Sequence, residues 1–490
     1  MAELTPMMQQ YFDIKKQHPD KILFFRLGDF YEMFYDDAIL ASKELELTLT
    51  GRDCGQEERA PMCGVPFHSY ENYVARLIAK GYKVAICEQM EDPALAKGLV
   101  KRDIIRVVTP GTVIESSMLQ DDKNNYIASI YITEKKAGVC FADVSTGTAH
   151  ATVLTDEKLG PEIISELCRY SPSEVLFNAA ILDYKEVTAY IKQQLACSVE
   201  LLDEAAFAPD ACMEEMRAQF GDAPEKTAGL APESPAFTAL AVLLGYLKET
   251  QKKGVERLKT VHNYAEAQYM QLSPVTRANL ELTETMRGRE KKGTLLWVLD
   301  KTETSMGKRQ LRAWIEQPLV DSSVINQRLD AVEALYNANV TRADLKEALS
   351  HVYDIERLTT RILYGSATPK EVKALGDTCV YLPQVRQLAR QCTTPLLQEL
   401  SGAVDPLEDL LDLINRALVE DPPANLKDGG AIRAGFNAEV DELRDIMHGG
   451  KGFLSQLEAK LKEETGIPKL KIGFNKVFGY YIEVSRSYAA

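Results

Sequence analysis

The N-terminal part of the chain alternates between short apolar runs and amphipathic patterns. Residues 22–35 begin as an apolar, β-rich run with Arg26 inside it. Gly28 interrupts this run, as a β-bulge or a close backbone approach would. From residue 36 to residue 46, apolar residues recur mostly at helical spacing. The pattern predicts a strand followed by a helix, with residues 30–32 near the strand end or in the turn between the two.

Similar short elements continue to about residue 112. A short amphipathic helix is predicted at 5–17, and a second helix at 69–80 that Gly81 closes. The apolar stretches 48–50 and 84–88 are typical of strands. These elements together predict a mixed α/β domain.

A different pattern begins near residue 124. Residues 125–132 and 138–145 alternate like two strands of a hairpin, and 147–153 is typical of a third strand. Residues 221–235 are rich in Gly, Pro, Ala and Glu, which predicts a loop, and a long helix is predicted from 236 to 253.

The rest of the chain is dominated by helical spacing. Residues from about 256 to 425 are predicted to be nearly all helix, and Asp321 is placed to cap one of these helices. Residues 431–466 are again helical, with an expected interruption at 448–452. Residues 469–474 and 478–484 predict a pair of strands. The chain is therefore expected to be multidomain, α/β and then all-α, with a short β segment last.

Length and composition fit a normal globular protein. A chain of 490 residues typically forms three or four domains, and 45% hydrophobic with 26% charged residues is ordinary. No apolar run approaches the roughly 20 residues of a membrane span, and no signal-peptide pattern opens the chain. The nine cysteines are scattered without a Cys-x-x-Cys pair. We expect reduced thiols in a cytoplasmic protein, without a zinc site.

The charge distribution leaves two interpretations open. A net charge of −15 taken alone argues against a nucleic-acid partner. Basic residues nevertheless gather locally, at Lys97, Lys101, Arg102 and Arg106, and in the segment 277–312, which has nine Lys or Arg against five Asp or Glu. Each run fits either a phosphate-contacting patch or a solvated face.

Phe30 and Glu32 form the most informative pair of residues. In an extended strand, residues two apart point the same way, about 7 Å from each other. On spacing alone, the favoured interpretation is a core phenylalanine and a solvated glutamate.

The sequence around this pair changes that interpretation. Residues 28–34, Gly-Asp-Phe-Tyr-Glu-Met-Phe, closely resemble the mismatch-reading motif of the MutS family of bacterial DNA mismatch repair proteins. The resemblance continues, in order and at similar spacing, through residues 60–68, 71–73, 84–89 and 107–112, and then through 274–282 and 302–309. It implies a mismatch-recognition domain at 1–112, a ribonuclease-H-like connector at 124–255, a helical core or lever domain at 256–425 and the start of a β-rich clamp domain at 426–490.

The resemblance also implies roles for individual residues. Phe30 is expected to wedge into the minor groove and stack on a mispaired base, and Glu32 to hydrogen-bond that base. An apolar wedge costs a few kcal/mol of base unstacking, and less where the step is already mispaired. A carboxylate near phosphates repels every duplex and recovers energy only where a displaced base offers a partner.

Further DNA contacts are implied at the edges of this site and in the clamp. The expected residues are Arg52, Met62 and His68 beside the wedge, and Lys469, Lys471 and Lys476 as phosphate contacts. A satisfied structural histidine is an equal alternative for His68. Lysines on an edge strand also serve to discourage aggregation.

No nucleotide site is expected in this chain. A P-loop requires Gly-x-x-x-x-Gly-Lys-Ser/Thr, which neither 307–309 nor 450–452 satisfies. No catalytic residue, cofactor or metal is therefore predicted here, and the chain is expected to be a fragment. The resemblance implies that a complete member is an ATPase that uses ATP and Mg, forms a homodimer and acts with a MutL-like partner. This fragment is expected to be largely monomeric and not membrane-bound.

Three alternatives remain open. The first is a MutS-like paralogue that binds branched recombination DNA, against which Phe30 and Glu32 argue. The second is a ribonuclease-H-like nuclease centred on Asp143, although two-metal chemistry needs several converging carboxylates and the sequence offers no convincing partners. The third is a helical scaffold without a DNA role.

Overall fold

The computed structural model describes residues 4–91, 98–155, 158–195, 197–265, 268–475 and 479–484. The chain divides into two compact units. The first comprises Met1–Ala367 with Asp377–Pro406, and the second Thr368–Gly376 with Leu407–Ala490. Each unit is described by itself below.

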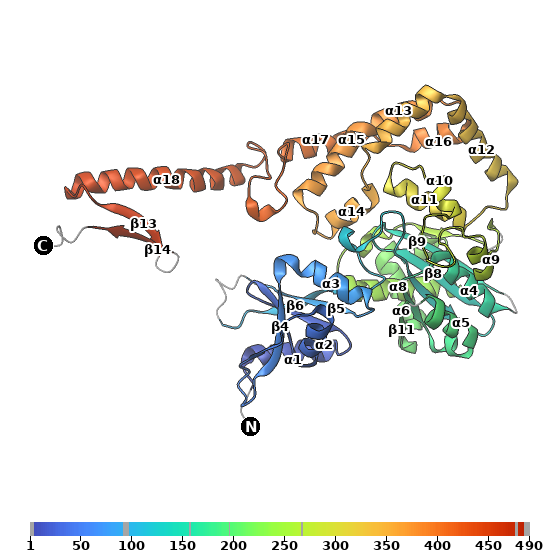
Figure 1. Ribbon diagram of the computed structural model, residues 1–490, viewed down its shortest axis with the longest axis horizontal. Helices are drawn as coiled ribbons and strands as arrows, with labels where there is room; N and C mark the ends of the chain where they lie inside the picture. The colour runs from blue at the N-terminus through green and yellow to red at the C-terminus, as the bar shows by residue number, and fades with distance from the viewer. Residues whose placement is uncertain are drawn as a thin grey trace. The chain divides into compact units, whose positions relative to one another are not determined.

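The first sheet of unit 1 is mixed and has six strands in the order β3-β4-β2-β1-β5-β6 (blue in Figure 1). Its strands are β1 (Ile22–Leu27), β2 (Phe30–Phe34), β3 (Thr50–Arg52), β4 (Ala60–Pro66), β5 (Val84–Gln89) and β6 (Arg102–Val108). The β1–β5 pair is parallel, and the other neighbours are antiparallel. The helices are α1 (Pro6–Gln17), α2 (Tyr35–Leu45) and α3 (Tyr70–Ala79), with 3-10 turns at Phe67–Ser69 and Ser116–Met118. Strands β4 and β6 were not predicted from the sequence.

Gly28 forms a hairpin turn between β1 and β2, and the expectation of a bulge in a single strand is wrong. Leu27 pairs directly with Phe30, so that Gly28 and Asp29 form a two-residue turn. Gly28 has a φ of 59°, a conformation that glycine adopts without strain and that tight hairpin turns require at this position. Phe30 is consequently the first residue of β2.

Helices cover the two faces of this sheet unequally. Tyr31 and Met33 point to the face that α2 and α3 cover. Phe34 points to the opposite face, where it packs with Tyr11 of α1 at a ring-centroid distance of 5.1 Å. Phe30 lies on the same face as Phe34 but is 46% exposed. The helix α1 therefore buries one end of β2 and leaves the other end open.

The second sheet of unit 1 has six strands in the order β11-β10-β7-β8-β9-β12. The strands are β7 (Ile127–Ile132), β8 (Ala137–Asp143), β9 (Thr148–Leu154), β10 (Glu174–Phe177), β11 (Ser198–Leu201) and β12 (Val261–Asn263). The first three form an antiparallel meander, in which the β7–β8 hairpin and the strand β9 are as predicted, and β10 and β11 run parallel to β7. β12 lies where the sequence pattern predicted helix. That expectation is wrong there, because the segment pairs parallel to β9.

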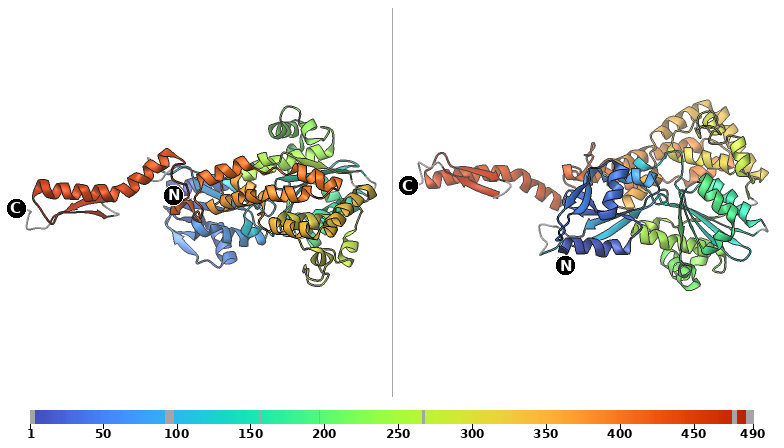
Figure 2. Two further views of the ribbon diagram at one scale, coloured as in Figure 1. Left: turned by 90° about the horizontal axis from the view of Figure 1, so that it is seen from above. Right: turned by 60° about the horizontal axis from the view of Figure 1, so that its bottom comes forward.

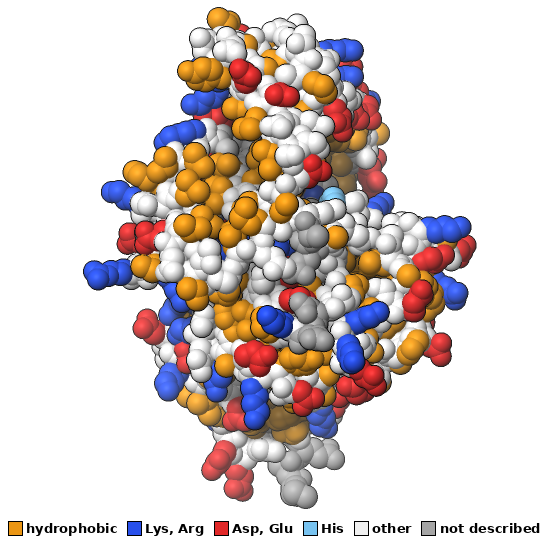
Figure 3. All heavy atoms as spheres, turned by 90° about the vertical axis from the view of Figure 1, so that its right-hand side faces the viewer, with side chains coloured by type: hydrophobic (Ala, Val, Ile, Leu, Met, Phe, Trp, Pro, Cys, Tyr) orange, Lys and Arg blue, Asp and Glu red, His pale blue; other side chains and the backbone are white. Residues whose placement is uncertain are grey.

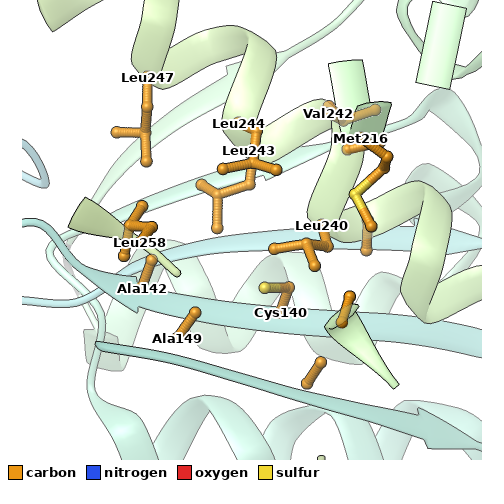
Figure 4. Packing of buried hydrophobic residues seen from close by; sticks show 14 of the residues in the cluster. Cys140, Ala142, Ala149, Met216, Leu240, Val242, Leu243, Leu244, Leu247 and Leu258 are labelled. Carbon is orange, nitrogen blue, oxygen red and sulfur yellow. The ribbon is translucent and has the colours of Figure 1, made fainter. Parts of the chain in front are cut away.

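Helices pack on both faces of the second sheet. They are α4 (Leu159–Tyr170), α5 (Lys185–Tyr190), α6 (Pro209–Phe220), α7 (Pro224–Ala228) and α8 (Pro235–Gln251), with a π-helical segment at Ile191–Leu195 and 3-10 segments at Ala179–Asp183, Glu204–Phe207 and Val255–Arg257. Leu240 and Leu243 of α8 pack with Cys140 and Ala142 of β8, as Figure 4 shows. On the other face, residues of α4 pack against β7 and β8. At Gly138 a Cβ atom would lie 2.0 Å from the Pro235 carbonyl oxygen, so glycine allows α8 to approach the sheet this closely.

The following segment is mainly helical, as predicted. Its helices are α9 (Pro274–Asn279), α10 (Leu295–Leu299), α11 (Ser305–Glu316), α12 (Ser322–Asn337), α13 (Asn339–Ser350), α14 (Ile355–Leu363), α15 (Pro369–Arg390) and α16 (Pro395–Ala403). Residues 369–376, at the start of α15, belong to unit 2. The expected cap at Asp321 is confirmed, since its carboxylate accepts a hydrogen bond of 2.8 Å from the Ser323 N–H.

Three arginines tie this helical segment to residues 120–123, which link the two sheets. Arg309 and Arg312 of α11 donate to the carbonyls of residues 121 and 122, at 3.3 and 3.1 Å. Arg357 of α14 donates to the carbonyls of residues 120 and 123, both at 2.8 Å. We call Arg309, Arg312 and Arg357 the arginine clasp.

Unit 2 contains α17 (Glu408–Ala417), a 3-10 turn at Leu426–Asp428, the long helix α18 (Ala438–Thr465) and the strands β13 (Lys471–Asn475) and β14 (Gly479–Glu483). The strands form the predicted antiparallel pair. Both views of Figure 2 show this pair beside α18, and the Ile472 N–H donates to the Glu458 carboxylate at 3.1 Å. The expected interruption at 448–452 is wrong, since α18 continues through it.

Exposed apolar side chains are frequent on α10, α11 and α12, including Trp297, Val298, Trp314, Val332 and Tyr336. Figure 3 shows one face of the molecule on which hydrophobic side chains gather. Apolar surface of this kind is typical of a contact surface. Among the described residues, no helix is both long and apolar enough to cross a membrane.

Candidate nucleic-acid interface

Phe30 occupies the open end of β2, beside the exposed Gly28–Asp29 turn. Its in-register neighbours are Leu27 on β1 and Pro66 on β4, neither of which is fully buried. The interpretation of Phe30 as a core residue, which spacing alone favoured, is therefore wrong. An exposed aromatic ring on a protruding hairpin has the shape and chemistry to stack on a flat apolar partner.

Glu32 lies two residues further along β2 on the same face and forms an ion pair with Arg52 of β3. The Glu32 side chain is 14% exposed and the Arg52 side chain 39% exposed. The expectation of a solvated glutamate is wrong, because a guanidinium covers its carboxylate. The strand between them contributes Gly64 opposite Glu32, where a Cβ atom would lie 3.4 Å from the Glu32 Cγ.

Arg26 braces the hairpin turn that presents Phe30. Its Nε donates to the Gly28 carbonyl, and its Nη1 lies 3.3 Å from a Glu88 carboxylate oxygen. The guanidinium also lies 3.7 Å from the centroid of the Phe67 ring. The Phe67 N–H in turn donates to the Asp29 carbonyl at 3.0 Å. These contacts fix the positions of both turn residues, Gly28 and Asp29. The sequence alone showed Arg26 only as a basic residue inside an apolar run.

Tyr31 anchors β2 from the opposite face. Its hydroxyl donates to Glu88, and burial together with this carboxylate raises the pKa of Tyr31 well above its ordinary value. The Tyr31 hydroxyl therefore stays protonated at neutral pH, and the strand that carries Phe30 and Glu32 is held from its buried side.

Of the other residues expected beside the wedge, His68 lies near Phe30 at this end of the sheet, whereas Met62 lies at the end of β2 that α1 covers. Met62 lies on β4 opposite Phe34 and is half-buried. His68 is exposed in the 3-10 turn after β4, with its ring edge-on to Phe67 at 5.9 Å. The loop from residue 53 to residue 59 is anchored at Cys54, whose carbonyl accepts from the Thr5 N–H at 3.1 Å.

The two arginines of the first basic run, Arg102 and Arg106, lie on β6 and do not form an exposed phosphate-binding patch. Arg102 is buried and donates to the Arg26 carbonyl and the Gln10 side chain, at 2.8 and 3.0 Å. Arg106 forms an ion pair with Glu115. Lys101 is exposed, and Lys97 lies outside the described residues. In the second basic run, Arg309 and Arg312 belong to the arginine clasp.

The lysines expected in the clamp belong to unit 2. Lys469 and Lys471 are exposed, and Lys471 lies opposite Glu483 on β14. Lys476 lies outside the described residues. Their phosphate contacts stay a prediction.

Asp143 is a structural residue. It is fully buried, and its carboxylate accepts hydrogen bonds from the Ser145 hydroxyl at 2.7 Å, the Asn124 amide at 2.8 Å and the Asn125 N–H at 3.1 Å. In the part of the chain that the structure describes, no group of three or more His, Cys, Asp or Glu residues is arranged to hold a metal ion. Among these described residues, Asp143 has no carboxylate partners for two-metal nuclease chemistry.

Three family models match consecutive parts of the chain. The model for MutS domain I matches residues 5–117, that for MutS domain II matches residues 125–261, and that for MutS domain III matches residues 275–471. The hairpin with Phe30 and Glu32 lies in the part matched by domain I, and the arginine clasp lies in the part matched by domain III. The second sheet, except for the last two residues of β12, lies in the part matched by domain II.

Curated relatives match along the whole chain. The chain is 48% identical to a DNA mismatch repair protein MutS of Ruminiclostridium cellulolyticum over 488 residues, which is 100% of this chain and 56% of the relative. It is also 48% identical to the MutS of Acetivibrio thermocellus over 492 residues, and 44% identical to that of Lachnoclostridium phytofermentans over 489 residues, with 56% and 52% of those relatives covered. The chain thus spans about half the length of the curated relatives that it matches. With three domain models in order and this identity throughout, the chain belongs to the MutS family and corresponds to its domains I, II and III.

Proposed function

We propose that this chain binds duplex DNA and recognises mispaired bases and small insertion or deletion loops, as the reading part of a DNA mismatch repair protein. The observation that supports this proposal is the placement of Phe30 and Glu32 side by side on one face of β2. An exposed aromatic ring and a partly covered carboxylate project from the same face of β2, at the end that α1 leaves open. The names of the relatives, DNA mismatch repair protein MutS, agree with this function.

In this proposal, Phe30 is a wedge whose insertion distinguishes DNA base steps by how easily they deform. Insertion of an apolar side chain at a base step costs a few kcal/mol of lost stacking. A mispaired step is already weakened, so the same insertion costs less there. Phe30 gains stacking on the exposed base, and Glu32 gains a hydrogen bond where the displaced base offers a donor.

The remaining domains carry supporting roles. The strand order of the second sheet, with an antiparallel meander followed by two strands parallel to its first member, supports a ribonuclease-H-like connector. The buried, fully bonded Asp143 speaks against a nuclease in that domain, and Phe30 with Glu32 speaks against a paralogue specialised for branched DNA. The ATPase activity, the homodimer and the MutL-like partner of a complete relative remain predictions for the whole protein, with this chain alone largely monomeric.

Replacement of Glu32 is expected to change the affinities for matched and mismatched DNA unequally. Glu32→Ala should tighten binding to matched duplex, because an anion near the phosphates is removed. Binding to a mismatched duplex should tighten less or weaken, because a hydrogen bond to a charged group, worth about 1.5–3 kcal/mol, is lost as well. The mismatch preference should therefore fall, and Glu32→Gln, which keeps a hydrogen-bonding side chain, should lose less of it.

Competition binding of matched and mismatched duplexes at two salt concentrations measures this directly. Repulsion between exposed charges weakens with salt, whereas a direct hydrogen bond is much less sensitive to it. If both duplexes gain the same factor in affinity at each salt concentration, Glu32 does not read the base.

A further inference from the structure

The ion pair between Glu32 and Arg52 covers the carboxylate that the proposed function requires for base contact. Arg52 lies opposite Ala60 in the sheet and Glu32 lies opposite Gly64, so the arginine reaches diagonally across β4 to the carboxylate. Gly64 has no side chain to compete for the space next to the Glu32 stem. A base cannot use the carboxylate oxygen that faces the guanidinium until the pair opens.

Arg52 has a second partner available once it leaves Glu32. Its side chain is 39% exposed, so the guanidinium is accessible to solvent and to a phosphate group. Guanidinium groups bind phosphate and carboxylate oxygens with similar geometry.

We propose that Arg52 is a specificity-determining residue that exchanges partners on recognition: it stays paired with Glu32 on matched DNA and moves to a backbone phosphate when a mispaired base takes its place. This inference rests on the proposed function and deepens it. On matched DNA the ion pair neutralises the negative charge of Glu32, and it also keeps the Arg52 cation from contacting a phosphate. On mismatched DNA both groups gain a partner in the same step.

The exchange predicts a difference in salt dependence. Each phosphate neutralised by a side chain adds about 0.9 to the slope of log affinity against log salt. Mismatched duplex should therefore show a slope steeper than matched duplex by about one contact. In Arg52→Ala this difference should vanish, and in Glu32→Ala it should vanish as well, because the freed arginine then contacts both duplexes.

The affinities should follow the same logic. Arg52→Ala removes the phosphate contact that only the mismatched complex makes, so binding to mismatched duplex should weaken by roughly two- to fivefold, the range of an exposed ion pair. Binding to matched duplex should weaken as well, because Glu32 is left uncovered. In the Glu32→Ala background the same replacement should weaken both duplexes by one factor. Arg52→Lys keeps the charge and should retain most of the slope difference.

The experiment is fluorescence anisotropy of the 490-residue chain with labelled matched and G·T-containing duplexes, over a series of salt concentrations. Arg59→Ala is the matched control, since Arg59 is an exposed arginine at the end of the loop 53–59 that follows Arg52, and its loss should affect both duplexes equally. Equal slopes in the wild type, or a slope difference that persists in Arg52→Ala, would overturn the exchange while the mismatch preference stands. A wild-type chain without any mismatch preference would overturn the proposed function and the exchange together.

Discussion

Phe30→Ala is expected to abolish the preference for mismatched over matched DNA while leaving the fold nearly unchanged. Base–aromatic stacking is worth about 1–3 kcal/mol, which is the size of a typical preference of this kind. Nearly half of the Phe30 side chain is exposed, so its removal creates no sealed cavity. The measurements are competition binding with matched and mismatched duplexes, and thermal melting of the wild type and the variant.

Phe34→Ala is the matched control for this prediction. Phe34 has the same side chain on the same strand and face, but it is fully buried against Tyr11. Its truncation should cost about 3–5 kcal/mol of folding stability. If Phe30→Ala lowers the melting temperature as much as Phe34→Ala does, Phe30 is a core residue after all.

Arg309→Ala is expected to destabilise unit 1 by about 3–5 kcal/mol, the cost of removing one partner from a buried ion pair. The Arg309 side chain is 3% exposed and binds both Asp354 oxygens, at 2.7 and 2.8 Å, and Glu356 at 2.6 Å. The variant leaves the Asp354 carboxylate without its main cation. Denaturant unfolding of both proteins measures the difference.

The cost of Arg309→Ala should shrink as the pH falls. Burial by itself would raise the pKa of Asp354, but the hydrogen bonds and charge of Arg309 outweigh it, and the pKa lies below its ordinary value. The stabilisation is therefore complete above the unfolded-state pKa, near 4, and is lost as the pH falls through the lower folded-state pKa. Lys346→Ala, which breaks an exposed pair with Glu303, should cost less than about 1 kcal/mol. A pH-independent difference, or equal losses in the two variants, would contradict this role.

Local pattern predicted many of the elements and two of the pairings between strands adjacent in sequence, but no pairing between strands distant in sequence. The helix after β2, the β7–β8 hairpin, the strand β9 and the cap at Asp321 follow from spacing and residue type alone. The hairpin at Gly28 was missed because an apolar run interrupted by one glycine fits a bulge as well as a turn. Strand β12 was missed because three residues carry no periodicity, and its partner β9 lies more than a hundred residues earlier.

The candidate site was only partly predictable for the same reason. Spacing favoured a buried Phe30, and only the resemblance to MutS suggested an exposed one. The burial of Arg102 and Arg309 depends on partners that are distant in sequence, so a count of basic residues could not separate them from a phosphate patch. The Glu32–Arg52 pair joins residues two strands apart and has no signature in the linear sequence.

The central claim is that Phe30 itself contacts the mispaired base. The most direct test incorporates the photo-crosslinking residue p-benzoylphenylalanine at position 30 and, as a control, at position 39, an exposed apolar position on α2 of the same domain. After irradiation with matched and G·T-containing duplexes, crosslinks from position 30 should map to the mispaired step and form in several-fold higher yield with the mismatched duplex. Crosslinks of equal yield on both duplexes, or equal yields from positions 30 and 39, would contradict the claim.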